Sequence, residues 1–435
     1  MGDFAHLRKR CLVPNRKAIG PGDLSFRKYR SVRVVAMLIA IAAGSSAADA
    51  QSAMAADPAG QTQGFLLTRF HPAIYAGNFA TDCPQGFELS TRDGYVATLS
   101  PAERNWLLKP EHAEEFNKKW RQDYTSGPYG EDICANPHSF LNDKRHPPFR
   151  GSQSKIAEGL NLDGTTDGKA TANSCAHQKL VGPSGEAGVD NQVSRALGCS
   201  ALWRGSDGFG DQLGFREQYM KDGVHNILME IRGITDLKND DVVVSIYSAA
   251  SKPLLDANVN YIPNQTMTIT SNKKWHNTVH GKILNGVLTT DSIDVLRLDE
   301  VSPLGGGSGL GYGREFALHL ARLRVTINPD GTLKGVMGAY DDFDDISSNS
   351  LDGKGAATET GLNCAAQYNT LEAMADGFPD PKTGKCTMIS TAFHVEAVPV
   401  FLIHPDSLST SADASPVVAP TEIGRKVRVS SLNGK

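Results

Sequence analysis

The chain of 435 residues is long enough for two or three domains, and its 40% hydrophobic and 21% charged residues are typical of a folded globular protein. This composition excludes a collagen-like, coiled-coil or largely disordered chain. Residues 1–50 hold nine Lys or Arg and three Asp or Glu, which leaves 35 basic against 45 acidic residues in the rest, a net charge of −10. An acidic chain lacks the basic surface that nucleic acids require, so we expect no nucleic-acid partner.

The N-terminal residues have the order of a secretory signal. Basic residues at 27–33 precede an apolar run at 34–43, and Ala48-Asp49-Ala50 fits the Ala-x-Ala cleavage pattern. Residues 1–26 read as a long leader, an appearance that a start codon placed too far upstream would also give. We therefore expect residues 1–50 to be removed on export to the periplasm or the medium, and we expect no transmembrane segment in the rest.

Seven cysteines are present, and Cys11 lies in the segment expected to be removed. The other six, an even number in an oxidising compartment, predict disulfides. They are Cys83, Cys134, Cys175, Cys199, Cys364 and Cys386. Because closing a short loop costs the least chain entropy, near neighbours are expected to pair, namely Cys83 with Cys134, Cys175 with Cys199 and Cys364 with Cys386. No Cys-x-x-Cys spacing occurs, which excludes the usual zinc and haem motifs.

Residues 51–150 are predicted to form a small helical and loop segment. Residues 51–64 are small and polar and are expected to be loose. Ser100, followed by a proline and by Glu103, forms a capping box that predicts the start of a short helix. A second helical stretch is expected over residues 110–123.

From residue 151 to 405 the pattern changes to β-strands and predicts a disulfide-stapled β-domain. Runs rich in β-branched residues lie at 224–234, 242–248, 266–271, 279–289, 292–298, 316–327, 332–339 and 388–404. Two short helices are expected at 190–197 and 364–376, each ending at a glycine. The predicted fold class is mainly β, an antiparallel, jelly-roll-like β-sandwich with a small N-terminal helical segment. Residues 406–435 are predicted to form a flexible tail.

Two of the strands are expected to be irregular. In 316–327 the apolar residues change parity, which a bulge near Ala321-Arg322 would reconcile. Pro329-Asp330-Gly331 then predicts a β-hairpin into the next strand. Pro399 has no backbone donor, so the strand 388–404 is expected to lie at a sheet edge or to be split.

The stretch 159–199 is the main candidate site because it gathers oxygen donors between two cysteines. Asp163, Asp167 and Asp190 are candidate calcium ligands, and no other cofactor is expected. The spacing of Asp163, Thr165 and Asp167 imitates an EF-hand loop, but Ser174 stands where the bidentate Glu should be. Turn formation by the Asp-Gly pairs is the alternative interpretation. The candidate ligand-binding residues are Asp190, Asn191, Gln192 and His177.

Other candidate motifs are weaker. Cys175 and His177 could act as a nucleophile and a base only if Cys175 were free, against the even cysteine count. His276 and His280 lie on one face of a predicted strand and could form half of a metal site. The glycine-rich run 305–313 matches no phosphate-binding motif and is expected to be a surface loop. The aspartates at 341, 342, 344 and 345 are expected to cap a helix, with a calcium site as the alternative.

The order of motifs from Leu162-Asp163-Gly164 through Cys175-Ala176-His177 to Gly188-Val189-Asp190-Asn191-Gln192 is similar to segments of secreted proteobacterial proteins that form an uncharacterised family. The likeness covers about residues 155–404. It implies one exported domain, with no activity, ligand or mechanism attached.

Three functions from different classes are compatible with these patterns, and the catalytic residues of any enzyme among them are unknown. The first is a periplasmic or secreted ligand-binding β-domain for an extracellular glycan or an envelope component. Its candidate sugar-stacking residues are Trp203, Tyr219, Trp275 and Tyr312. The second is a secreted hydrolase with paired carboxylates, for which the candidates are Asp163, Asp167, Asp190 and Glu230. The third is a structural envelope protein, and the oligomeric state is open for all three.

Overall fold

The structure is a computed structural model, and it describes residues 60–126, 132–205, 210–299, 315–343, 346 and 361–405. All of them belong to one compact unit, Ala55–Lys435. The predicted secretory signal, the glycine-rich run 305–313 and the tail 406–435 lie outside the described residues. Among the helices of the described ranges, none is both long and apolar enough to cross a bilayer.

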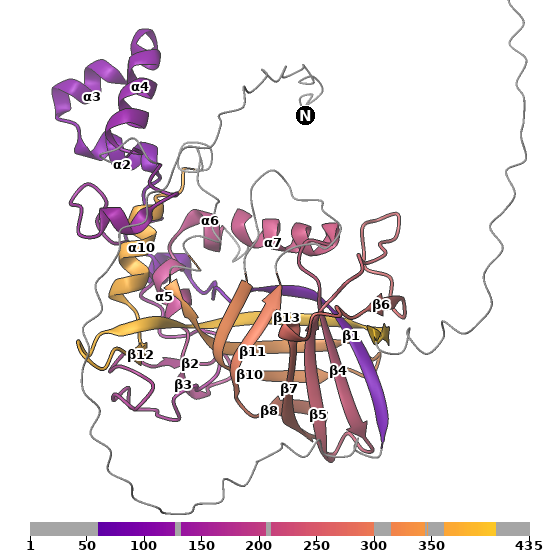
Figure 1. Cartoon of the computed structure of the whole chain (residues 1–435). Coiled ribbons are helices and arrows are strands. Elements are labelled where there is room, and N and C mark those ends of the chain that lie inside the picture. Colours follow the sequence, from indigo (N-terminus) through magenta and orange to yellow (C-terminus); the bar gives the residue numbers. More distant parts are fainter. Residues whose placement is uncertain are drawn as a thin grey trace, which may run out of the picture. The chain divides into compact units, whose positions relative to one another are not determined.

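The main sheet closes into an eight-strand antiparallel β-barrel (Figure 1). Around the barrel the strands are β1 (Gln61–Pro72), β4 (Ile227–Ile234), β5 (Asn239–Ser248), β7 (His276–Leu284), β8 (Val287–Thr290), β10 (Glu315–Ile327), β11 (Leu333–Asp342) and β13 (Cys386–Ile403). The ring closes because β1 pairs with β4 on one side and with β13 on the other. Closure provides ladder partners around the whole ring.

The predicted jelly-roll-like β-sandwich is therefore wrong, although the prediction of a mainly β protein is right. Inward and outward residues alternate along a strand in both architectures, so the pattern within each strand does not separate them. The deciding element is β1, which joins the last barrel strand, β13, to β4. Its sequence, QTQGFLLTRFHP, lacks a regular alternation, and it falls within residues 51–150, where the sequence predicts only helix and loop.

The remaining strands extend or flank the barrel. They are β2 (Leu180–Val181), β3 (Ala187–Val189), β6 (Thr266–Thr268), β9 (Ile293–Asp299) and β12 (Gly377–Pro379). β9 pairs with β10 beyond the end of β8, so β8 and β9 together fill one place in the ring. The Asn277 side chain joins β7 to β9, because its amide donates to the Arg297 carbonyl and its oxygen accepts from the Arg297 N–H, both at 2.9 Å.

Turn residues account for two hairpins. The sequence predicts residues 279–289 as one strand, but Asn285-Gly286 divides them into β7 and β8. Both turn residues have the positive φ that a two-residue hairpin requires, 51° and 78°. The predicted hairpin at Pro329-Asp330-Gly331 is confirmed between β10 and β11, and so is the bulge in β10, where the register shifts between His319 and Arg322.

Pro399 lies inside β13, which runs unbroken for 18 residues. It is paired with Phe65 of β1, while the pairing with β11 ends at Ala397 and the pairing with β6 begins at Phe401. On this side of β13, Pro399 therefore lies between the end of the pairing with β11 and the start of the pairing with β6. Its missing backbone N–H costs no hydrogen bond between strands there. The strand is therefore not split, and it lies inside the sheet over most of its length, while Pro399 itself has a paired neighbour on one side only.

The interior of the barrel is filled with apolar side chains. The rings of Phe70 and Phe393 stack with their centroids 4.6 Å apart, and Phe316 meets both edge-on. Leu288 and Leu318 in the same cluster are fully buried. The interior is therefore a packed core that stabilises the fold, and any ligand-binding surface has to be sought outside it.

Helices precede and interrupt the strands. They are α1 (Phe79–Asp82), α2 (Thr91–Thr98), α3 (Pro101–Leu107), η1 (Pro110–His112), α4 (Ala113–Asp123), η2 (Pro137–Phe140), α5 (Gln192–Leu197), α6 (Ala201–Arg204), α7 (Asp211–Asp222), η3 (Lys273–Trp275) and α10 (Cys364–Ala373). The predicted capping box is confirmed at α3, where Ser100 and Glu103 exchange hydrogen bonds. Phe116 and Trp120 of α4 are buried in a separate apolar cluster among α2, α3 and α4. The two predicted inserted helices correspond to α5 and α10.

The six cysteines form three disulfides, as the sequence predicts, but every predicted pairing is wrong. The bonds join Cys83 to Cys199, Cys134 to Cys364 and Cys175 to Cys386. Their sequence separations are 116, 230 and 211 residues. Loop-closure entropy describes the unfolded chain, whereas in this fold the barrel brings segments that are distant in sequence into contact. Three such bonds fit an exported protein.

Candidate functional site

Residues 155–192, which we call the covering layer, pack against the outside of the barrel. Leu160 and Leu162 lie so close to Gly338 of β11 that a side chain there would meet them at 3.1–3.3 Å. The backbone N–H of Gln192 donates to Ser390 Oγ of β13 at 3.0 Å. The candidate residues of this stretch therefore lie at a buried interface between the covering layer and the barrel.

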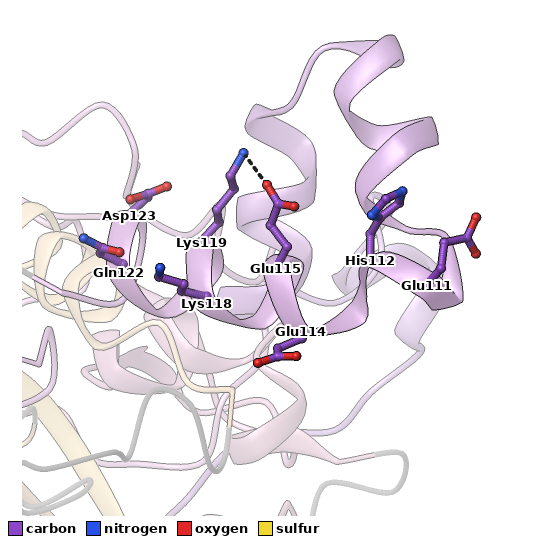
Figure 2. A pocket seen from close by; sticks show the side chains of 8 residues that line it. All are labelled: Glu111, His112, Glu114, Glu115, Lys118, Lys119, Gln122 and Asp123. Carbon is purple, nitrogen blue, oxygen red and sulfur yellow. Dashed lines mark ion pairs between the residues drawn. The ribbon is translucent and has the colours of Figure 1, made fainter.

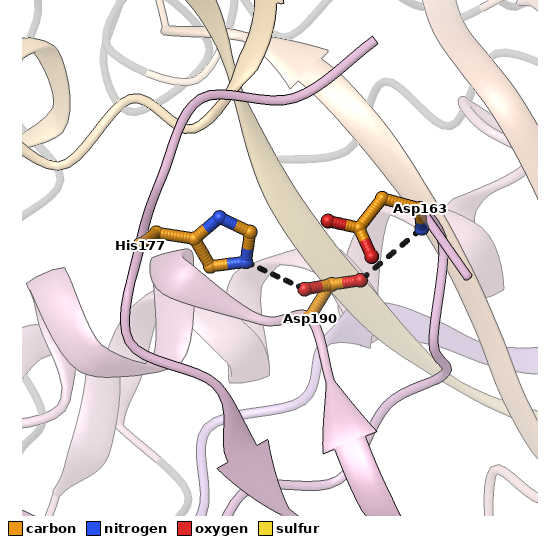
Figure 3. Close-up of side chains that lie close together, drawn as sticks. All are labelled: Asp163, His177 and Asp190. Carbon is orange, nitrogen blue, oxygen red and sulfur yellow. Dashed lines mark hydrogen bonds and ion pairs between the residues drawn. The ribbon is translucent and has the colours of Figure 1, made fainter. Parts of the chain in front are cut away.

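Five ionisable side chains meet at this interface, and we call them the charged cluster. They are Asp163, His177, Lys179, Asp190 and Asp376. Their side chains are at most 7% exposed. Figure 3 shows three of them, Asp163, His177 and Asp190, converging from separate segments of the chain. Four of the five come from the covering layer and the fifth from the C-terminal part of the chain.

Local backbone structure brings these side chains together. Asp190 follows β3 and forms an isolated bridge with Leu160, which places it beside Asp163. His177 and Lys179 are two residues apart in the extended segment before β2, and because side chains alternate between the two sides of such a segment, these two point to the same side. Asp376 directly precedes β12, which reaches the covering layer through the bridge between Ser174 and Gly377.

Asp190 is the centre of the charged cluster. Its Oδ1 accepts hydrogen bonds from Lys179 Nζ at 2.5 Å and from His177 Nε2 at 2.8 Å. Its Oδ2 accepts from the backbone N–H of Leu162 at 2.8 Å (Figure 3 shows the longer bond from the N–H of Asp163). A buried carboxylate is stable only when its oxygens are satisfied in this way.

Lys179 also links Asp190 to Asp163, because its ammonium donates to Asp163 Oδ1 at 2.6 Å. Asp163 Oδ1 accepts from the N–H and the hydroxyl of Thr165, and Oδ2 accepts from Ser174 Oγ at 2.8 Å. Burial opposes ionisation of Asp163, but these hydrogen bonds outweigh it and lower its pKa to about 2. Asp163 is therefore a carboxylate at any physiological pH.

His177 is held between two acceptors. Its Nδ1 donates to the Cys175 carbonyl at 2.8 Å, and its Nε2 faces Asp190 Oδ1, so both ring nitrogens carry a proton when both bonds form. Burial lowers the pKa of His177, but the Asp190 bond, the Asp376 charge and the Cys175 carbonyl outweigh it, and the pKa is raised.

Asp376 differs from the other two carboxylates. Its side chain is fully buried, and Oδ2 lies 3.5 Å from His177 Nε2 without a hydrogen bond from any described residue. Burial raises its pKa to about 6. Below about pH 6, where Asp376 is protonated, two carboxylates balance one ammonium and one imidazolium, and the charged cluster is then neutral as a whole.

The charged cluster is also the only group of metal-ligating side chains found among the described residues, since ligand atoms of Asp163, His177 and Asp190 lie within 4.8 Å of one another. Lys179 bears on whether a cation could bind there, because its ammonium already bridges Asp163 and Asp190. Calcium requires six to eight oxygen ligands, and most oxygens here already accept hydrogen bonds. The geometry fits an internally neutralised ionic network better than a calcium site.

The other candidate residues of this stretch have structural contacts. Asp167 lies apart from the charged cluster, half-exposed, and pairs with Lys169 at 2.6 Å. Asn191 is buried and caps α5 through the N–H of Ser194. Gln192 is buried and donates to the Gln178 carbonyl at 2.8 Å. The covering layer thus brings Asp163, His177 and Asp190 together and uses Asn191 and Gln192 to hold its own backbone.

The hydrolase candidates do not form a single site. Asp163 and Asp190 meet, but each side chain is 0% exposed, so a substrate has no direct access to them. Glu230 lies on β4, where it accepts hydrogen bonds from Tyr247 Oη and His404 Nε2.

The predicted helix cap at the acidic run is wrong for its first two residues. Asp341 and Asp342 are the last residues of β11, and positions 344 and 345 lie outside the described residues.

The candidate histidines and aromatic residues have partners of their own. His276 pairs with the Thr270 carbonyl, and His280 contacts Asp241 and Asp291, so the two do not share a site. Trp203 and Trp275 are buried, at 1% and 8% exposure, and cannot present a flat stacking surface to a sugar. Tyr219 lies in α7, and Tyr312 falls outside the described residues.

Sequence reasoning missed Lys179 and Asp376. Lys179 carried a usable signal, because it follows His177 by two residues in an extended segment and must share its face. Asp376 carried none, since it joins the charged cluster only through the fold and through the Cys175–Cys386 bond, which the sequence pairs wrongly.

Comparisons with known proteins leave the family open: no family model matches the chain, and neither a curated protein nor a solved structure matches it significantly. The resemblance to uncharacterised secreted proteobacterial proteins therefore stays a prediction. The functional argument depends on the geometry alone.

Proposed function

We propose that this protein is an exported binding protein, periplasmic or secreted, that recognises a carboxylate-bearing glycan or envelope component through its N-terminal helices. The observation that supports the proposal is a surface hollow of about 210 Å³ among α2, α3 and α4, with basic and amide groups over an apolar floor. A binding role is favoured over hydrolysis because Asp163 and Asp190, the carboxylates that the covering layer brings together, are buried and paired with Lys179, so a substrate does not reach them.

The hollow has the two parts that an amphipathic acid needs. Leu107 and Phe116, each 3% exposed, form the floor, and the Arg92 guanidinium lies 5.2 Å from the centre of the Phe116 ring. Lys109 and the Asn117 amide complete the polar rim. None of the described residues that line it is Asp or Glu, and neither Arg92 nor Lys109 has an ion-pair partner among the described residues. A guanidinium and an ammonium in one rim favour a carboxylate.

A second hollow on α4, of about 640 Å³, provides a contrast (Figure 2). Its lining side chains project outward from the helix and are of mixed sign, with Glu115 and Lys119 already paired at 3.3 Å. Four carboxylates and only two ammonium groups line it, so its charge does not favour an acid. This hollow has the larger volume of the two, but the smaller one is the better candidate binding site for an acid because its charged groups are basic.

The test is calorimetric titration of the mature protein with two acids, glucuronate and hexanoate, and with their neutral counterparts glucose and hexanol. Binding of an acid without its neutral counterpart, weakened by salt, supports the proposal. The double variant Arg92→Gln/Lys109→Gln should lose this binding. Lys118→Gln, on the side of α4 that carries the larger hollow, is the matched control and should keep it. Equal binding by both variants, or binding of no acid, contradicts the proposal.

A second function, that of a structural envelope protein, is favoured by a different observation. Each of the three disulfides joins segments more than 100 residues apart, so together they fix the chain from Cys83 to Cys386. Such bonds are typical of proteins that have to stay folded in the oxidising environment outside the cytoplasm. Resistance to protease that depends on the disulfides, together with no binding of any acid, would favour this role.

A further inference from the structure

We infer that Lys179 and Asp163 condense spontaneously to an intramolecular isopeptide bond that locks the covering layer. The reacting atoms are already in contact, with Lys179 Nζ 2.6 Å from Asp163 Oδ1. Both side chains are withdrawn from water, at 6% and 0% exposure. A nucleophile and a carbonyl group held in contact in one molecule react with a high effective concentration.

The reaction balances without any further reactant. One ammonium proton first moves to Asp163, so that a neutral amine faces a neutral carboxyl group; the nitrogen then bonds to Asp163 Cγ, and the bond from Cγ to Oδ2 breaks. Two of the three ammonium hydrogens leave with Oδ2 as water, and the third stays on the amide nitrogen. One positive and one negative charge disappear together, so the desolvation cost of the buried ion pair is relieved.

Neighbouring groups supply the proton transfers that this step needs. Asp190 Oδ1 lies 2.5 Å from Lys179 Nζ and can accept the second proton, which leaves the nitrogen as it attacks. The Thr165 N–H donates to Asp163 Oδ1 at 2.8 Å and stabilises the negative charge that grows there. Ser174 Oγ donates to Oδ2, the oxygen that leaves.

Two further residues of the charged cluster complete the path of the proton. His177 Nε2 lies 2.8 Å from Asp190 Oδ1 and 3.5 Å from Asp376 Oδ2. A proton taken up by Asp190 can therefore be shared with His177 and Asp376, next to the reacting pair. Asp376 Oδ2 can take that proton because it has no hydrogen-bond partner among the described residues, whereas Oδ1 accepts from the Ser390 N–H at 2.6 Å.

The chain contains its own negative control. Lys169 and Asp167 lie at the same distance, 2.6 Å, but their side chains are 82% and 51% exposed. Water stabilises both charges there, and no third carboxylate contacts the ammonium among the described residues. The same pair of functional groups is thus reactive in the buried position and inert in the exposed one.

The cross-link would stand beside the Cys175–Cys386 disulfide and would close the loop from residue 163 to 179. The covering layer would then be fixed to itself by an amide and to β13 by a disulfide. Unlike the disulfide, the amide would survive a reducing environment.

The experiment is mass spectrometry of the purified mature protein after reduction and tryptic digestion. The expected result is a branched peptide that joins the segments of Asp163 and Lys179, with a mass about 18 Da below the sum of the two, the mass of one water. Lys179→Arg and Asp163→Ala should each abolish it, and Lys169→Arg should keep it. Asp190→Asn, which removes the proton acceptor, should leave the two segments unlinked in folded protein.

Two results would overturn the inference. The first is wild-type protein in which the two segments are recovered as separate linear peptides. The second is a loss of about 18 Da that persists in Lys179→Arg, because Asp163 precedes Gly164 and an Asp-Gly pair can lose water by forming a succinimide instead. The wild-type measurement decides the question even if a variant fails to fold.

Discussion

The barrel interior and the interface beneath the covering layer are equally closed to water, yet opposite kinds of contact hold them. Inside the barrel, side chains such as Phe393 and Leu288 exclude water from one another. On the other side of the same wall, Asp163, Lys179 and Asp190 meet before any amide bond forms as buried charges that only their mutual contacts make tolerable. The first arrangement loses stability in proportion to the atoms removed, whereas the second fails when one partner is missing.

The largest effect is expected from Asp190→Ala. In this variant we expect no amide bond, so the Lys179 ammonium keeps Asp163 but loses its second carboxylate, and the His177 ring and the Leu162 N–H lose the Asp190 acceptor in a buried site. Breaking a buried ion pair from one side costs about 3–5 kcal/mol, and we expect urea unfolding to show a loss of this size. The control is Asp167→Ala, whose exposed pair with Lys169 should leave the unfolding midpoint unchanged. Equal effects of both variants would show that the charged cluster is not buried as described.

A cavity in the barrel should lower the free energy of unfolding slightly less than Asp190→Ala does, and for a different physical reason. Leu288 on β8 is fully buried in the interior, and Leu288→Ala removes apolar contacts without stranding a charge. We expect a loss of about 3 kcal/mol in the free energy of unfolding, within the range for buried leucines. Leu284, across the same hairpin turn, is 55% exposed, and Leu284→Ala should change little. Similar losses for both leucines would contradict the packed interior.

The two regions also differ in how far the sequence predicts them. The hairpin at Pro329-Asp330-Gly331, the bulge in β10 and the capping box at Ser100 depend on neighbours in the chain, and they were predictable. Barrel closure was not, because it depends on β1 meeting β13 across more than 300 residues. The disulfide pairing failed for the same reason, since the fold and not the loop length decides which cysteines meet.

The candidate site shows the same division. Asp163, His177 and Asp190 share one stretch of sequence, and the structure brings them together. Their burial, the bridging by Lys179 and the approach of Asp376 all come from packing against β11 and β13. The pattern of oxygen donors in the sequence therefore suggested a site for a metal cation. In the fold, the ammonium group of Lys179 occupies that place.

The pH dependence of stability should separate the two regions. The pKa of Asp376 is raised by burial to about 6 in the folded protein, against about 3.9 in an unfolded chain. As the pH rises from 4 to 6, the unfolded chain releases this proton first, so ionisation favours unfolding. The stability of the wild type relative to Asp376→Asn should therefore fall across this range and stay constant above it.

Urea unfolding of both proteins at several pH values measures this difference. Leu288→Ala is the control, because neither leucine nor alanine has a titratable side chain, and its offset from the wild type should be the same at each pH. A difference between wild type and Asp376→Asn that does not change between pH 4 and 6 would mean that Asp376 titrates normally and is not buried.

The smallest effect, none at all, is expected from removing or adding calcium. Lys179 Nζ lies 2.5 and 2.6 Å from oxygens of Asp190 and Asp163, the two side chains that would have to hold the ion, and it blocks them both as an ammonium and as the nitrogen of the amide. A bound ion at a hundredfold excess over its dissociation constant would add about 2.7 kcal/mol by mass action, enough to raise the melting temperature measurably. We therefore expect identical melting curves with EDTA and with calcium. A rise with calcium that Asp163→Asn abolishes would show that the ion displaces Lys179, and the covering layer would then be held by a metal and not by its own charges.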